Sequence, residues 1–310
     1  MASPFAEDAF VWMGGSYSPP TIAHIEMAAL VGLKVAATSG LKTHVFFVPV
    51  NDYYKKKSVS CVTFADRFHM LQLACDELNG RGLRNVFFHV SDYEALTAEE
   101  NGAWNKKEIK TYESIKQFIK RYGADKDNIY ISQGQDNIEG IIAGKWGFSR
   151  DLIFNCKLVC IPRVDPVIKD IVRLTRDGIK GLRDWVNVSK LNESGLSESG
   201  DDGIATLESV LERITILDVV PRLISSTDLR KIIRGWYGSA KGYDFETWVS
   251  GSGAVDPERT STLRPILDYI VSKRLYEDAT ACETGASGGT MKRRTRKKIL
   301  DYRPVPKFKA

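Results

Sequence analysis

Two short stretches, far apart in the chain, combine residue types that bind phosphate at the start of a helix. The first, GGSYSPPTIAH (Gly14–His24), follows the apolar run Ala9–Met13. Glycines at the end of a strand let the backbone approach a ligand closely. Thr21 is a favourable N-cap, so the helix that follows directs free N–H groups and a partial positive charge toward the strand ends. An anion is stabilised in such a place.

His24 would lie in the first turn of that helix and face the same cleft. An imidazole there can donate a hydrogen bond to a phosphoryl oxygen. Taken alone, a histidine on a helix more often packs in the core, and two glycines after a strand more often form an ordinary turn. The stretch also matches neither G-x-G-x-x-G nor G-x-x-x-x-G-K-S/T, the two commonest phosphate-binding patterns.

The second stretch, ISSTDLR (Ile224–Arg230), follows a predicted strand and opens a helix. Ser225 and Ser226 are natural N-caps, and Arg230 lies one turn into the helix. Hydroxyls, backbone N–H groups and a guanidinium at one helix start form a second phosphate site. The alternative is an ordinary capped helix with a surface arginine. The presence of both stretches in one chain favours the phosphate-binding interpretation of each.

The elements that must position these residues alternate between strands and helices. Apolar, β-branched runs predict strands at Ala9–Met13, Thr43–Val50, Asn85–Val90, Asn128–Ser132, Lys157–Pro162 and Arg213–Val219. Helical patterns are found at Ile22–Ala37, Phe64–Leu78, Trp104–Tyr122, a short segment after Asp136, Ser226–Arg234 and Thr262–Arg274. Thr63 and Asp66 form a predicted capping box before the second helix. The order implies an α/β, Rossmann-like doubly wound parallel sheet with helices on both faces and a helical C-terminal part.

Charge and composition divide the chain unevenly. We expect one domain over residues 1–277 with a flexible acidic insertion around 190–204, followed by a linker and basic tail, 278–310, that is disordered. Met291–Ala310 contains nine Lys/Arg and one Asp, so the remainder carries −3 of the total charge of +5. The body is therefore not a general binder of polyanions, and nucleic acid is not an expected partner.

The chain is expected to be intracellular, in the nucleus or the cytoplasm. Five cysteines in 310 residues favour reduced thiols, and Cys156 and Cys160 would face one side of a strand and pack there rather than bind zinc. The N-terminus shows no secretory pattern, and no apolar run approaches the roughly 20 residues of a membrane helix. The basic residues 292–298 are a candidate nuclear import signal; they lack the interleaved aromatic residues of an RNA-binding arm.

Three motifs together resemble those of the nicotinamide/nicotinate mononucleotide adenylyltransferases of eukaryotic type, within the nucleotidyltransferase superfamily. GSYSPPTIAH is similar to the signature G-S-F-N-P-x-T-x-x-H, and ISSTDLR to I-S-S-T-x-x-R. Between them, PVNDYYKKK (Pro49–Lys57) resembles S-P-V-x-D-x-Y-K-K-K; without its neighbours it would be an ordinary charged loop. The resemblance runs from about Phe10 to Glu277, is weak across 165–211 and is absent from the tail.

The resemblance implies transfer of the adenylyl group of ATP to nicotinamide mononucleotide, nicotinate mononucleotide or both. The products would be NAD or its deamido form and pyrophosphate, formed by direct in-line attack without a covalent intermediate. The sequence agrees in lacking G-x-S-x-G and a cysteine with an evident histidine partner. The implied cofactor is Mg²⁺, held mainly by phosphate oxygens and water, with no protein ligand identified. Homo-oligomers are common in the family.

The resemblance also implies roles for individual residues. The implied catalytic residues are His24, Arg230 and Lys57. ATP and its phosphates would contact Gly15, Ser16, Thr21, His24, Gly134, Asp136, Ser226, Thr227 and Arg230, with Gly134 and Asp136 at the adenosine ribose. The mononucleotide would contact Ser16, Tyr17, Lys57, Tyr93, Trp146 and Arg163. Thr21 stands where other members have the first histidine of an H-x-x-H motif, Tyr93 replaces a stacking tryptophan, and Arg67 aligns with a helix arginine.

Other functions stay open at this point. A pantetheine-phosphate adenylyltransferase or a CDP-alcohol-forming enzyme would share the fold, although the Lys-rich segment and Trp146 argue against both. A class I aminoacyl-tRNA synthetase fragment would also share it, but no K-M-S-K-S loop is apparent. A nucleotide-binding scaffold or chaperone without turnover belongs to a different class and would tolerate loss of His24.

Overall fold

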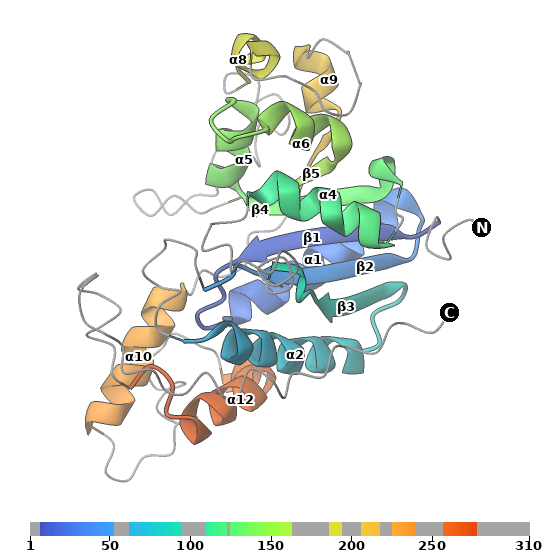
Figure 1. Cartoon of the computed structure of the whole chain (residues 1–310). Helices are drawn as coiled ribbons and strands as arrows, with labels where there is room; N and C mark the ends of the chain where they lie inside the picture. The colour runs from blue at the N-terminus through green and yellow to red at the C-terminus, as the bar shows by residue number, and fades with distance from the viewer. Residues whose placement is uncertain are drawn as a thin grey trace.

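Six described strands form one parallel sheet in the order β3-β2-β1-β4-β5-β6 (Figure 1). They are β1 (Ala9–Gly15), β2 (Thr43–Pro49), β3 (Val86–Val90), β4 (Ile129–Gly134), β5 (Lys157–Ile161) and β6 (Ile214–Ile216). Each neighbouring pair runs parallel. The predicted Rossmann-like fold is therefore confirmed. The strand order reverses between β1 and β4, and sheets of this kind bind ligands at such a switch point, outside the carboxyl ends of the strands.

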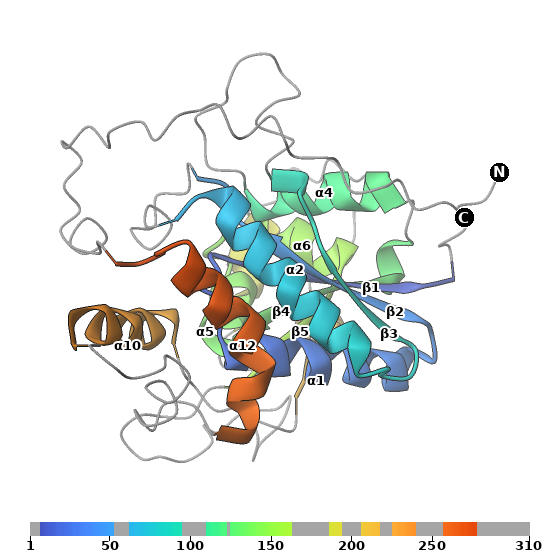
Figure 2. The same ribbon diagram turned by 90° about the horizontal axis from the view of Figure 1, so that it is seen from below.

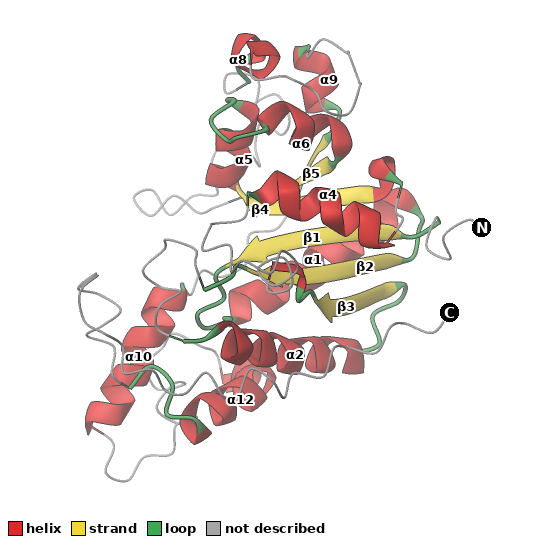
Figure 3. Ribbon diagram, viewed as in Figure 1, coloured by secondary structure: helices red, strands yellow, loops and turns green. Residues whose placement is uncertain are grey.

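Helices cover both faces of this sheet, as the secondary-structure colouring of Figure 3 shows. They are α1 (Ile22–Ser39), α2 (Phe64–Gly80), α4 (Thr111–Tyr122), α5 (Gln135–Ile142), α6 (Ser149–Asn155), α8 (Val188–Glu193), α9 (Leu207–Leu211), α10 (Ser226–Ser239) and α12 (Pro257–Ser272). One core cluster joins the sheet to α1, α2, α10 and α12, and a second joins it to α4, α5, α6, α8 and α9. α12 lies beside α2 on the first face (Figure 2).

This computed structural model describes residues 7–52, 62–94, 110–122, 125–162, 186–193, 206–217, 225–239 and 257–277. Several predictions made from the sequence lie outside these ranges. They concern Lys57, Arg163, most of the acidic insertion, the linker and the basic tail. The domain boundaries likewise stay a prediction.

The predicted elements differ from the observed ones at their ends and between residues 149 and 211. β1 continues two residues beyond Met13, because Gly14 and Gly15 still pair with Val48 and Pro49 of β2. The helix expected after Asp136 begins one residue earlier and contains it. α6, α8 and α9 were not predicted. Each spans seven residues or fewer, too few for a 3.6-residue repeat to stand out from the sequence.

Two local predictions can be compared directly with the structure. The backbone N–H of Asp66 donates to Thr63 Oγ1 at 3.1 Å, so the predicted cap of α2 is confirmed. The reciprocal bond differs, because the Asp66 carboxylate accepts from the Thr63 hydroxyl at 2.7 Å. Cys156 and Cys160 are free thiols buried in the same core cluster, as expected. Burial raises the pKa of the Cys160 thiol to about 12, which keeps it protonated and unreactive.

α1 is the one described helix that is long and apolar enough to cross a membrane, judged by length and composition alone, with a mean hydropathy of 1.3 over 18 residues. We expected no such segment. Its buried face explains the composition, since Ile25, Ala28, Val31 and Val35 belong to the core against the sheet. The helix lies so close to the strands that a Cβ at Gly32 would approach Val86 Cγ1 to 2.5 Å.

A chain of hydrogen bonds joins Asp8, His44 and His89 on the face of the sheet that α4 covers. His44 Nε2 lies 3.0 Å from Asp8 Oδ2, and His44 Nδ1 lies 3.0 Å from His89 Nε2. The two imidazoles also stack on each other and on neighbouring phenylalanine rings. Burial lowers the pKa of His89 to about 4, helped by the nearby His44 and Lys42. Burial also lowers the pKa of His44, against the opposing effect of Asp8.

These histidines should make stability depend on pH. Between about pH 6.5 and about pH 4, His89 binds a proton in the unfolded chain but not in the folded one, so the free energy of unfolding falls as the pH is lowered. The limiting slope for one such group is about 1.4 kcal/mol per pH unit. Urea denaturation at pH 7 and pH 5 should show a smaller difference for His89→Gln than for the unmodified chain. The exposed His69, changed to Gln, serves as control and should leave the difference unchanged; equal differences in all three proteins would contradict the prediction.

Candidate functional site

The start of α10 lies directly against the turn that follows β1. Ser226 Oγ donates a hydrogen bond to the Pro19 carbonyl at 2.8 Å. One arm of the Arg230 guanidinium, Nη1, donates to the Ser18 carbonyl at 2.5 Å. More than 200 residues separate the partners in the sequence. The structure thus brings the two predicted phosphate-binding motifs together beside the carboxyl end of β1, where α1 begins.

The same turn is held from its other side by α2 and by the loop that follows β2. Arg67 is fully buried, and its Nη1 donates to the Ser16 carbonyl at 3.0 Å. Its Nη2 donates to Asp52 Oδ1 at 2.9 Å, so the turn is tied to the loop that follows β2. The backbone N–H of Val50 donates to the Gly15 carbonyl at 3.0 Å. The family resemblance aligned Arg67 with a helix arginine but did not indicate these hydrogen-bond partners.

The carbonyl groups of this turn therefore point into the protein. Those of Gly15, Ser16, Ser18 and Pro19 each accept a bond from another element. Within the described part of the chain, no acceptor lies opposite the backbone N–H groups of Ser16 and Tyr17. Unpaired N–H groups beside a helix N-terminus form a site for an anion.

Aromatic rings fix the shape of the turn and explain its glycines. A Cβ at Gly14 would lie 2.0 Å from the Trp12 indole, and one at Gly15 would lie 2.9 Å from the Tyr17 ring. Tyr17 has a positive φ of 46°, and its hydroxyl donates to the Met13 carbonyl at 2.7 Å. Its side chain is thus buried in the core. Any contact between Tyr17 and a ligand in this arrangement would come from its backbone.

His24 occupies the first turn of α1, edge-on to the Tyr17 ring at a centroid distance of 5.1 Å. Its Nδ1 accepts from the backbone N–H of Thr21 at 3.1 Å and lies 2.8 Å from Thr21 Oγ1. Burial lowers the pKa of His24 to about 4. The imidazole is therefore neutral near pH 7. Thr21 is fully buried at the N-cap of α1, where it contacts the ring rather than solvent.

Arg230 serves partly as a structural brace. Its Nη2 donates to Thr227 Oγ1 at 3.0 Å, and its side chain is buried apart from a small exposed fraction. These two bonds fix the guanidinium at the start of α10. Thr227 is exposed at the start of α10, and Ser226 is half-buried there. The positive charge of Arg230 therefore lies at the junction of α10 with the turn.

Tyr276 is a site residue that sequence reasoning missed. It follows α12, has a positive φ of 64° and is buried, with its hydroxyl 3.4 Å from Ser18 Oγ. Burial raises the pKa of Tyr276, while the bond to Ser18 and the charges of Arg67 and Arg230 lower it. The phenol thus lies beneath the turn, near both arginines. No motif in the sequence includes Tyr276. The only available signal was that the family resemblance extends as far as this residue.

Gly134 and Asp136 lie at the switch point, where β4 ends and α5 begins. Gly134 is the extended N-cap of α5, and Asp136 is exposed in its first turn. Trp146 is half-buried beside α5, close enough that a Cβ at Gly140 would come within 2.9 Å of its Nε1. Tyr93 follows β3 and is buried. Gly134 and Asp136 thus lie at the carboxyl end of β4 and Tyr93 at that of β3, with β1 and β2 between these two strands, whereas Trp146 packs against α5.

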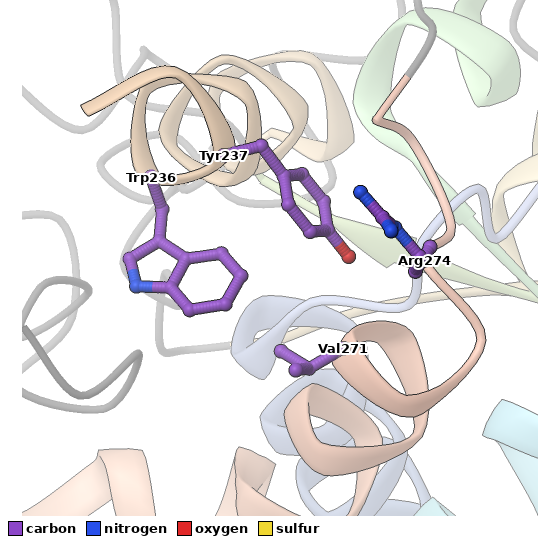
Figure 4. A pocket seen from close by; sticks show the side chains of 4 residues that line it. All are labelled: Trp236, Tyr237, Val271 and Arg274. Atoms are coloured by element: carbon purple, nitrogen blue, oxygen red, sulfur yellow. The ribbon is translucent and has the colours of Figure 1, made fainter. Parts of the chain in front are cut away.

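The hollow shown in Figure 4 is a separate feature. Trp236, Tyr237, Val271 and Arg274 line it, between α10 and α12. Trp236 is ten residues beyond Ser226, about 15 Å along the helix at 1.5 Å per residue. Arg274 Nε donates a hydrogen bond to Glu277 Oε2 at 2.7 Å. The hollow is therefore separate from the predicted phosphate site. Among the described residues, no group of three His, Cys, Asp or Glu side chains is placed to hold a metal ion.

Comparison with known proteins agrees with this arrangement. The sequence profile of the cytidylyltransferase-like family matches residues 12–232, a span that includes both motifs. A probable nicotinate-nucleotide adenylyltransferase of Dehalococcoides mccartyi strain 195 is 24% identical over 188 residues, covering 60% of this chain and 80% of the relative. A probable nicotinate-nucleotide adenylyltransferase of Acholeplasma laidlawii is 27% identical over 167 residues, covering 54% and 73%.

The packing of Trp12 on Gly14 gives a stability prediction. Gly14→Ala should lower the free energy of unfolding by about 1–3 kcal/mol, because the added methyl group overlaps the buried indole. Gly80→Ala is a matched control at the end of α2, where an added Cβ meets nothing within 4 Å. The control should be neutral or stabilising by up to about 1 kcal/mol. Chemical denaturation of both variants tests this, and a Gly14→Ala protein as stable as the unmodified chain would show that the turn does not need the glycine.

Proposed function

Because the chain belongs to the cytidylyltransferase-like family and is a nucleotidyltransferase, we propose that it transfers the adenylyl group of ATP to a pyridine mononucleotide. The acceptor would be nicotinamide mononucleotide, nicotinate mononucleotide or both. The observation that carries the proposal is the contact of Ser226 and Arg230 with the turn Ser18–Pro19, which unites two phosphate-binding helix starts. The names of the relatives, probable nicotinate-nucleotide adenylyltransferases, favour a pyridine acceptor.

The proposed reaction needs no enzyme nucleophile. An oxygen of the mononucleotide 5′-phosphate bonds to the α-phosphorus of ATP while the bond from that phosphorus to the departing oxygen breaks. The electron pair leaves with pyrophosphate, and a dinucleotide remains. The buried thiols Cys156 and Cys160 have raised pKa values and do not suit a nucleophilic role. The protein would then contribute positioning and charge stabilisation.

Three sets of donors would stabilise the phosphate charge. The N–H groups of Ser16 and Tyr17 would bind one phosphate, with His24 beside them at the start of α1. Ser226 and Thr227 would bind the outer phosphates at the start of α10, where the helix dipole is favourable. Arg230 would add positive charge from its buried position. Gly15 would allow the ATP phosphates to approach the backbone of the turn. Thr21 would act through His24.

Magnesium fits this site only as a companion of the nucleotide. The described residues offer no cluster of carboxylates, whereas Mg²⁺ bound to ATP is held mainly by phosphate oxygens and water. When bound, the ion would neutralise charge on the phosphates. The adenosine ribose would bind Asp136 and Gly134 at the switch point, and the pyridine ring would lie near Trp146 and Tyr93.

The acceptor assay tests this proposal directly. Purified protein is incubated with ATP and Mg²⁺ and, in separate reactions, nicotinamide mononucleotide, nicotinate mononucleotide or phosphopantetheine. We expect pyrophosphate and a dinucleotide with at least one of the two pyridine acceptors. CTP in place of ATP tests the nucleotide. Product with phosphopantetheine alone, or with CTP alone, would replace the proposed function by that of another nucleotidyltransferase.

His24→Ala tests whether the site is catalytic. The variant should lower kcat by about 10²-fold or more, the scale found when one transition-state donor is removed. ATP binding, measured by calorimetry, should persist because the backbone donors remain. His69→Ala is the control, since His69 is exposed on α2. Undiminished turnover in His24→Ala would remove the imidazole from the reaction, and ATP binding without turnover in the unmodified protein would favour a scaffold.

A further inference from the structure

The two ring nitrogens of His24 have different surroundings. The backbone N–H of Thr21 points at Nδ1 over 3.1 Å. A backbone N–H can only donate, so Nδ1 must be the acceptor and carries no proton. In a neutral imidazole the proton then resides on Nε2.

We propose that Thr21 is a positioning residue that fixes His24 as the Nε2–H tautomer, so that the ring acts as a neutral hydrogen-bond donor to a phosphoryl oxygen. The catalytic part of this inference rests on the proposed adenylyl transfer. The tautomer itself rests on the structure alone. The inference assigns to Thr21 a role through His24 rather than a direct contact with the nucleotide.

The surroundings of Thr21 make this arrangement rigid. Its side chain is fully buried, its backbone is extended, and its carbonyl accepts the N–H of His24 at 3.0 Å as the first bond of α1. On the other side, the edge-on ring of Tyr17 limits rotation of the imidazole, and the Tyr17 hydroxyl is itself tied to Met13. The imidazole plane is therefore held between an N-cap and a core tyrosine.

The alternative protonation states conflict with this geometry. An Nδ1–H tautomer or an imidazolium would place a second donor against the Thr21 N–H, at the 3.1 Å separation that now forms a hydrogen bond. Burial acts in the same direction on the charged form, because it lowers the pKa of His24 to about 4. His24 is thus suited to donate through Nε2 and unsuited to accept a proton as a general base.

Nuclear magnetic resonance of the histidine rings tests the tautomer without substrate. The chain contains only four histidines, at positions 24, 44, 69 and 89, so His→Gln variants assign each ring in the ¹⁵N-histidine-labelled full-length protein. At pH 7 we expect His24 to show the correlation pattern of a ring protonated on Nε2 alone, unchanged down to about pH 5. A proton on Nδ1, or titration near pH 6.5, would overturn the proposal.

Kinetics of Thr21 variants test the positioning role. Thr21→Ser keeps the hydroxyl and should retain activity close to that of the unmodified enzyme. Because Nδ1 carries no proton, the Thr21 hydroxyl, 2.8 Å away, donates to it as a second bond. Thr21→Val keeps the volume and the backbone N–H but loses this hydroxyl, and should lower kcat about tenfold with little change in KM, by analogy with the loss of a partner that orients a histidine ligand. An unchanged kcat in Thr21→Val would overturn the positioning role. If this variant does not fold, the spectrum of the unmodified protein still decides the tautomer.

The two proposals fail in different ways. An active enzyme whose His24 carries its proton on Nδ1 would overturn the inference and leave the proposed function standing. A protein with the Nε2–H tautomer but without adenylyl transfer to either pyridine acceptor would overturn the proposed function. In that case the catalytic role inferred for the tautomer would be overturned as well.

Discussion

The inward orientation of the carbonyl groups in the turn after β1 is the constraint on which the rest of the site depends. A peptide unit that directs its carbonyl inward directs the N–H of the next residue outward. Donors from α2, α10 and the loop after β2 hold the carbonyls of Gly15, Ser16, Ser18 and Pro19. The bonds from Val50 and Arg67 thus direct the N–H groups of Ser16 and Tyr17 outward. The bonds from α10 hold carbonyls that precede Pro19 and Pro20, which have no N–H, and they join α10 to the turn.

The site combines neutral donors with charges that are already partly engaged. The two arginines nearest the turn, Arg67 and Arg230, each spend donors on backbone carbonyls. His24 is neutral. Burying an unpaired charge in such a place would cost several kcal/mol, roughly the penalty for an isolated ion in a protein interior. The arrangement avoids much of this cost before a ligand arrives, because every buried charged group described at the turn already has a hydrogen-bonding partner.

The sequence was most informative where one physical signal dominates. Strands β1 to β5 follow from β-branched and aromatic runs, and the helix starts at Ile22, Phe64 and Ser226 follow from capping chemistry. Side-chain direction within the first motif did not follow: Tyr17 has a positive φ, and its ring is buried in the core with its hydroxyl bonded to Met13. The contacts of Arg67 and Tyr276 could not be predicted either, because partners that are distant in the sequence leave no periodic pattern in a single sequence.

The position of Tyr276 bears on how the protein is made. The sheet strands β1 to β4 are complete by residue 134, whereas Ser226, Arg230 and Tyr276 all come from the last third of the described chain. A ribosome releases the chain from its N-terminus onward, and domains fold as their segments emerge. The nascent chain can thus build its sheet early, but the turn acquires its second arginine and its supporting phenol only after synthesis has passed residue 276. The turn would accordingly reach its final set of contacts later than the first four strands of the sheet.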